Sequence, residues 1–125
     1  MATKSVHNDV LDAMLDKIAT ATSQSVCSTA PTTRTEAVTT NMLATVTVTP
    51  GDGSGDFTIA DDSSGRKVTI TEQAAIEVIN TGDAEHIAYT DDSDLLYVTT
   101  CTLQGLTDGN TVTVPAHKIN VADPT

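Results

Sequence analysis

The sequence predicts a mainly β fold, a single antiparallel β-sandwich or small barrel with one N-terminal α-helix. Threonine occurs 24 times among the 125 residues, and β-branched side chains lose χ1 freedom in helices but fit a pleated sheet. From residue 42 onward, apolar residues alternate with polar ones, which is the period of a half-buried strand. A helical period occurs only near the N-terminus.

The length and composition predict one domain with a thin core. A chain of 125 residues can bury a core of its own, but it contains only three aromatic residues, Phe57, Tyr89 and Tyr97. We therefore expect one domain over residues 1–125, made of a helix at 8–22, a connector at 23–41, a β-sandwich at 42–122 and a tail at 123–125.

The predicted helix, NDVLDAMLDKIATAT, has Asn8 as its expected N-cap and acidic residues in its first turn, where the helix dipole favours anions. At 100° per residue, one stripe of the helix is apolar and consists of Val10, Leu11, Met14, Leu15 and Ile18. This stripe must be covered. It packs either on the domain's own sheet or on a neighbouring subunit, and the sequence leaves both alternatives open.

The connector that follows is polar and rich in threonine. Thr33 and Glu36 have the spacing of a capping box, so we expect one or two helical turns there at most.

Short strands at turn-punctuated intervals are expected from residue 42. The segment MLATVTV places Met42, Ala44, Val46 and Val48 on one face, and Pro50 ends it. Further alternating apolar pairs, separated by Gly, Asp, Ser or Asn, are Phe57 and Ile59, Val68 and Ile70, Ile76 and Val78, and Ile87 and Tyr89.

The last strands differ in pattern. The segment DLLYVTTCTL begins with apolar residues on both faces, which predicts a central strand covered on both sides at its start. Pro115 confines the strand TVTV to a sheet edge or breaks it before HKINV. The tail ADPT should be polar and exposed.

The acidic stretch GDGSGDFTIADDSSG, residues 51–65, raises the question of a calcium loop. An EF-hand loop needs glycine at its sixth position and glutamate at its twelfth, but counting from Asp52 these positions hold Phe57 and Ser63. We interpret the stretch as two loops that bracket a strand. Adventitious cation binding at Asp61 and Asp62, or at Asp91, Asp92 and Asp94, is the less favoured alternative.

No catalytic, cofactor-binding or metal-binding residue is predicted. The sequence has no GxSxG, Walker A or HExxH motif, and the spacing of His7, His86 and His117 does not gather them into a site. Cys27 and Cys101 belong to no CxxC pair. We interpret both as small buried hydrophobic residues, with a disulfide between them left open.

The charge excludes two classes of partner. Seventeen acidic residues against six basic ones give a net charge of −11, and no basic stripe is present to neutralise phosphates. We therefore expect neither nucleic acid nor an anionic membrane as a partner. No apolar run is long enough to span a bilayer, and the start MATKSVHNDV lacks a signal-peptide core, so we expect a chain made and used without export.

Four segments taken together resemble a known class of proteins: HNDVLDAMLDKI at 7–18, FTIADDSSGRKVTI at 57–70, LLYVTTCT at 95–102 and VPAHKINVADPT at 114–125. They are similar to small virion structural proteins of tailed double-stranded DNA bacteriophages, encoded in the head-morphogenesis region. Asp62 directly precedes the serines, where a slightly longer glycine-containing turn is expected in relatives. No functional residue can be transferred, because the class has no site motif to match.

The resemblance implies a capsid decoration, or cement, protein. Such a protein would be made in the host cytoplasm, would bind the major capsid protein at the capsid surface of the virion, and would form a homo-oligomer, a dimer or a trimer. The alternatives are a neck, tail or fibre-base component with a host-binding role, and a binding module or enzyme outside the virion. Candidate partner-binding residues lie on the helix stripe and the connector: Val10, Met14, Ile18, Thr33, Arg34 and Glu36.

Overall fold

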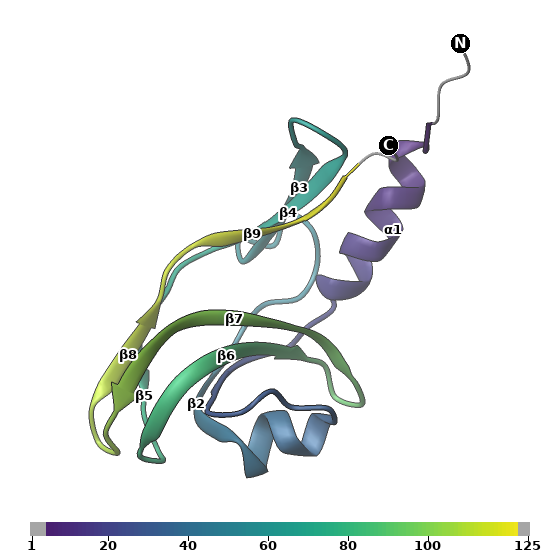
Figure 1. Cartoon of the computed structure of the whole chain (residues 1–125). Coiled ribbons are helices and arrows are strands. Elements are labelled where there is room, and N and C mark those ends of the chain that lie inside the picture. The colour runs from purple at the N-terminus through teal and green to yellow at the C-terminus, as the bar shows by residue number, and fades with distance from the viewer. Residues whose placement is uncertain (1–4, 123–125) are drawn as a thin grey trace.

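The computed structural model describes residues 5–122 and confirms a mainly β architecture, with antiparallel sheets and an N-terminal helix (Figure 1). The predicted tail 123–125 lies outside the described residues. Along the chain the elements are α1 (Asn8–Ile18), β1 (Ser23–Cys27), the π-helical segment η1 (Glu36–Thr40), β2 (Met42–Thr47), β3 (Phe57–Asp61), β4 (Arg66–Ile70), β5 (Gln73–Glu77), β6 (Gly82–Thr90), β7 (Leu95–Leu106), β8 (Thr111–Val114) and β9 (His117–Val121).

The strands form three antiparallel sheets with the orders β2-β1-β6-β7, β3-β4-β9 and β5-β8. The first and third sheets meet at one edge, where Ala44 forms a bridge with Val78 and the Ile79 N–H donates to the Leu43 carbonyl at 2.9 Å. Strand β8 ends at Val114 and β9 begins at His117, so the strand breaks at Pro115, one of the two alternatives that the sequence predicted. All three sheets therefore enclose one core, as in a small sandwich.

The main core is mostly aliphatic and gathers side chains from the helix and every strand. Its largest fully buried members include Tyr89, Phe57, Leu15 and Ile70. A second, smaller cluster lies on the other face of the four-stranded sheet, where Ala37 of the η1 segment packs with Cys27 and Ala88. The first sheet is therefore covered on both faces.

Helix α1 is shorter than predicted and starts from a different cap. His7, in extended conformation, is the N-cap, and its Nδ1 accepts from the Asp9 N–H at 3.1 Å. The helix ends at Ile18 instead of residue 22, because the Thr20 hydroxyl donates to the Lys17 carbonyl at 2.6 Å and the Thr22 N–H pairs with Thr90. These bonds satisfy groups that a longer helix would have used.

The predicted connector 23–41 is wrong for its first part, because Ser23–Cys27 form a strand of the four-stranded sheet, between β2 and β6. The sequence SQSVC hides this strand, since Gln24 and Ser25 are polar although both are fully buried. Two of their polar groups find partners inside the sheet: the Gln24 amide nitrogen donates to the Tyr89 hydroxyl at 2.7 Å, and the Ser25 hydroxyl lies 3.2 Å from that of Thr45. Hydrogen bonding lowers the cost of burying such groups.

Strand β7 is an edge strand, which corrects the predicted central position. The apolar coverage on both faces is confirmed. Leu96 and Tyr97 pack on the main core, whereas Leu95 and Val98 pack on the cluster around Ala37. The η1 segment covers the second face of the sheet at this point. A strand can therefore be apolar on both faces without lying between two other strands.

The acidic stretch is confirmed as two loops around a strand. Strands β3 and β4 form a hairpin, and Gly65 occupies its turn with a φ of +78°. The Asp52 carboxylate accepts from the Ile59 N–H at 2.9 Å. The Asp56 carboxylate accepts from the Thr49 N–H at 2.6 Å, the Thr71 hydroxyl at 2.9 Å and the Gln73 amide at 3.2 Å. Asp56 therefore links three segments of the chain.

Replacing Gly65 by alanine should destabilise the protein by about 2–4 kcal/mol, because a Cβ would have to adopt positive φ and would also overlap neighbouring backbone. An ideal Cβ at this position lies 1.9 Å from the Val121 carbonyl oxygen. Gly53 is the matched control, since it has a φ of +80° and no atom within 4 Å of such a Cβ. Gly53→Ala should cost about 1–2 kcal/mol. Urea unfolding measures the free energy of unfolding of both variants. Equal losses of stability would contradict the proposed overlap of the Cβ with the backbone.

Replacing Asp56 by asparagine should cost about 1–2 kcal/mol at neutral pH through weakened hydrogen bonds. The Thr49 N–H is the main cause of the lowered pKa of Asp56, from an ordinary value of 3.8. A lowered folded-state pKa adds stability above the unfolded-state pKa, and this stability is lost as pH falls through the folded-state pKa. The stability difference between wild type and Asp56→Asn should therefore narrow below about pH 4.

Urea unfolding at several pH values tests this, with Asp92→Asn, an exposed position of the β6–β7 turn, as the charge control. A difference for Asp56→Asn that stays constant down to pH 3 would refute the role of the carboxylate charge.

Candidate functional site

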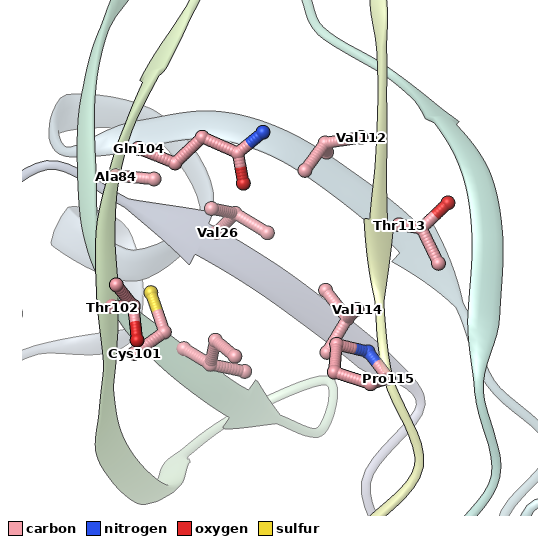
Figure 2. A pocket seen from close by; sticks show the side chains of 10 residues that line it. Val26, Ala84, Cys101, Thr102, Gln104, Val112, Thr113, Val114 and Pro115 are labelled. Carbon is pink, nitrogen blue, oxygen red and sulfur yellow. The ribbon is translucent and has the colours of Figure 1, made fainter.

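A groove lies between β7 and β8, and we call it the seam. It holds a cavity of about 240 Å³. Figure 2 shows Cys101, Thr102 and Gln104 on one side and Val112 to Pro115 on the other. Its floor is apolar and consists of Val26, Ala84 and Ile87.

The seam continues toward β9. A second hollow of about 320 Å³ shares Ile87, Cys101, Thr102, Val114 and Pro115 with the first, so the two form one continuous groove. His117 and Lys118 line this second part. The Lys118 ammonium lies 3.0 Å from the Asp62 carboxylate, and this contact is the main cause of the lowered pKa of Asp62.

The seam exists because two consecutive strands do not pair. Strands β7 and β8 are joined by a four-residue turn at 107–110, a connection typical of a hairpin. Strand β8 pairs with β5 instead. The turn is fixed on the β5 side, where Val78 N–H donates to the Asn110 carbonyl and Gly109 N–H donates to the Val78 carbonyl, both at 2.9 Å.

An irregularity on each side accompanies this separation. In β7, Cys101, Thr102 and Leu103 all lie opposite the single residue Glu85, because Thr100 pairs with His86 and Gln104 with Ala84. In β5, the register shifts between Gln73 and Ile76, and Ala75 there has a φ of +55°. Bulges bend a strand and redirect its side chains, and here they flank the seam.

A chain of hydrogen bonds closes the β9 end of the seam. The Gln24 amide donates to the Tyr89 hydroxyl, which lies 2.5 Å from His117 Nε2. His117 Nδ1 lies 3.0 Å from the Pro115 carbonyl oxygen. A carbonyl can only accept, so Nδ1 carries the proton and the Tyr89 hydroxyl donates to Nε2. Burial raises the pKa of Tyr89, which keeps this hydroxyl protonated.

The seam offers backbone and apolar groups but no activated nucleophile. Burial, together with Glu85, raises the pKa of the Cys101 thiol, and the protonated thiol is a weak nucleophile. Among residues 5–122, three buried side-chain atoms have no hydrogen-bond partner: Gln24 Oε1, His86 Nδ1 and Thr90 Oγ1. None of these three residues lines either hollow.

Cys27 and Cys101 are both free. Strand β6 lies between their strands, and two strand spacings come to about 9.5 Å, beyond the Cα separation of about 7 Å that a disulfide spans. Burial raises the pKa of Cys27 to about 11. The disulfide that the sequence left open is thus not formed.

Within residues 5–122, no group of three or more His, Cys, Asp or Glu side chains could hold a metal ion. Three of the five aspartates weighed as cation ligands bond to the protein through their carboxylates: Asp61 to Arg66 at 2.6 Å, Asp62 to Lys118, and Asp91 to the N–H groups of Ser93 and Asp94. No helix in this part of the chain has the length and apolar character to cross a membrane.

The predicted stripe of the helix divides into two parts. Leu11, Leu15 and Ile18 are buried in the chain's own core, so Ile18 is not a surface residue as the partner-binding prediction required. Val10 and Met14 are 62% and 58% exposed. The Asp12 carboxylate, 2.7 Å from Arg66, fixes the helix to β4.

The connector residues of the predicted surface lie elsewhere. Arg34 Nε donates to the Asp91 carbonyl oxygen at 2.6 Å, and the Glu36 N–H donates to the Thr33 hydroxyl at 3.2 Å. The Glu36 carboxylate accepts from the Thr32 N–H at 2.7 Å, not from Thr33, so only half of the predicted capping box forms. These residues adjoin η1, on the opposite face of the four-stranded sheet from α1 (Figure 1). The fold therefore does not bring the six predicted residues together.

Sequence reasoning missed the seam. The turn TDGN between two alternating segments is typical of a closed hairpin, and no local pattern shows that β8 pairs with β5 instead of β7. The chain matches no protein-family model, no curated protein and no solved structure in these comparisons.

Replacing Tyr89 by phenylalanine should cost about 1–3 kcal/mol, because the Gln24 amide and His117 Nε2 lose their buried partner. Tyr97 is the matched control. Its ring packs on that of Tyr89 with centroids 6.4 Å apart, and it is only half-buried. Tyr97→Phe should change the free energy of unfolding by less than about 0.5 kcal/mol. Equal losses in urea unfolding would refute the role of the hydrogen-bond chain.

Proposed function

We propose that the chain is a structural protein of a tailed-bacteriophage virion, without catalytic activity. In this proposal it is a capsid decoration protein that binds the major capsid protein on the outside of the assembled head and clamps neighbouring capsomers. A dimer or trimer would couple several weak contacts through effective concentration.

The observation that carries the proposal is the resemblance of four segments, which correspond to α1, the β3–β4 hairpin, the start of β7, and β9 with its flanks. These segments are far apart in the sequence, but α1 packs against β3, β4, β7 and β9. The resemblance therefore covers elements that pack together, although none of its segments carries a site motif.

The surface gives a second line of support. Val10 and Met14 lie one helical turn apart and leave an apolar patch on a helix whose other side is fixed to the core. A rigid helix loses little conformational freedom when its exposed side chains dock on another protein. The net charge of −11 keeps such a chain soluble before assembly.

Electrophoresis of purified particles of the encoding phage tests the proposal. The decoration role predicts a band comparable in intensity with that of the major capsid protein, and particles lacking the protein should lose their DNA at a lower temperature. A faint band on the gel, together with density at a single vertex in a reconstruction of the particle, would point to the neck, tail or fibre base. Absence from purified virions would refute both.

Met14→Ser tests the helix patch. It should reduce the number of bound copies per particle while leaving the free energy of unfolding unchanged, because Met14 is exposed. Ile79, 44% exposed in the segment after β5, is the matched control, and Ile79→Ser should bind as wild type. Equal occupancy for Met14→Ser and wild type would exclude the patch from the interface.

A further inference from the structure

We propose that the seam binds an extended, uncharged peptide segment of another protein, which adds as a strand to the free edge of β7. This inference goes beyond the virion assignment and holds whether or not the chain is a virion protein.

The strands on both sides of the seam have backbone groups that a peptide could pair with. Within residues 5–122, β7 pairs only with β6, β8 only with β5, and β9 only with β4. The edges of β7 and β8 that face the seam therefore carry N–H and C=O groups without a strand partner. An unpaired edge of this kind is a template for an added strand. The part of β7 that lines the two hollows, 99–104, lies opposite only the four residues 84–87 of β6 because of its bulge. At 3.3 Å per residue this edge spans about 13 Å, enough for about four residues of an added strand.

The apolar floor of the seam determines which side chains of an added peptide would fit. Successive residues of a strand point to opposite sides, so every second residue of an added strand would face Val26, Ala84 and Ile87, which are all buried and apolar. The two hollows, about 240 Å³ and 320 Å³, leave room for small or β-branched side chains. The residues between them would face outward and can be polar.

Charge narrows the occupant further. The chain carries seventeen acidic residues, but no carboxylate lines either hollow. Lys118 is the one charged side chain of the lining, and Asp62 already neutralises it at 3.0 Å. An acidic segment would be repelled by the surrounding surface, and a basic one would find no partner inside the seam. The complementary segment is therefore uncharged.

The seam is also held open. Strand β8 is retained by its pairing with β5, and β7 carries a bulge at 101–103 on the other side of the seam. Thr113 of β8 further binds the β5 bulge, since its hydroxyl accepts from the Ala75 N–H at 3.4 Å. A groove that is formed before binding saves the ligand the cost of opening it.

Nuclear magnetic resonance on the full-length chain with a synthetic peptide tests the proposal. The probe is acetyl-Thr-Val-Thr-Val-Thr-Val-amide with a polyethylene glycol tag for solubility. It should shift the amide signals of 99–104 and 112–114 and slow their hydrogen exchange. The same peptide with two N-methylated amides should bind about tenfold more weakly, because it lacks backbone donors. A version with glutamate in place of two threonines should also bind more weakly.

Two neighbouring exposed residues of β7 provide a variant that should block the seam and a matched control that should not. Thr102 lines both hollows, whereas Leu103 lines neither and is 57% exposed. Thr102→Trp should fill the seam and abolish peptide binding, while Leu103→Trp should bind within twofold of wild type.

The proposal is overturned if saturating probe leaves the amides of 99–104 unchanged, if N-methylation has no effect, or if the two tryptophan variants bind alike. Sedimentation of the free chain adds one outcome. A dimer that Thr102→Trp dissociates and Leu103→Trp preserves would assign the seam to a second copy of this chain and would likewise overturn the proposal.

Discussion

The pairing of β8 with β5 is the constraint on which most of this architecture depends. It draws β8 away from β7, although a turn of four residues joins them, and it directs the chain past Pro115 into β9. Strand β9 can then pair with β4, which brings the β3–β4 hairpin onto the core. The same pairing leaves β7 as an edge strand with one side unpaired. Edge strands are usually shortened, charged or covered, but β7 is long and carries no charge between Leu95 and Leu106.

Polar groups position the segments that the thin core cannot fix by itself. Asp12 and Arg66 join the helix to β4. Arg34 joins the segment before η1 to the β6–β7 turn, and Asp56 joins three segments of the chain. Many of the acidic residues that give the chain its charge are thus hydrogen-bonded. Asp91, which caps its own turn, is another example, and its lowered pKa has that cause.

The proposed contacts use surfaces of different physical character. The helix patch of Val10 and Met14 offers apolar area on a rigid support, while the seam offers unpaired backbone above an apolar floor. The first suits a broad, weak contact repeated over many copies. The second suits one extended segment, since main-chain hydrogen bonds supply affinity and the floor supplies selectivity. A protein that stabilises an assembly can use both kinds of contact together.

The sequence by itself determined the fold class, the two loops around β3 and the presence of one amphipathic N-terminal helix, because these depend on local periodicity and turn chemistry. It did not determine how much of the helix stripe is buried, since Val10 and Met14 of that stripe are exposed. Of the candidate site, it indicated the segments that form the two sides of the seam but not their separation. Only the tertiary structure decided that SQSVC is an inner strand, since Gln24 is buried against a tyrosine 65 residues away. It also decided that β8 pairs with β5 instead of β7. Strand partners are chosen by long-range contacts that local pattern does not encode.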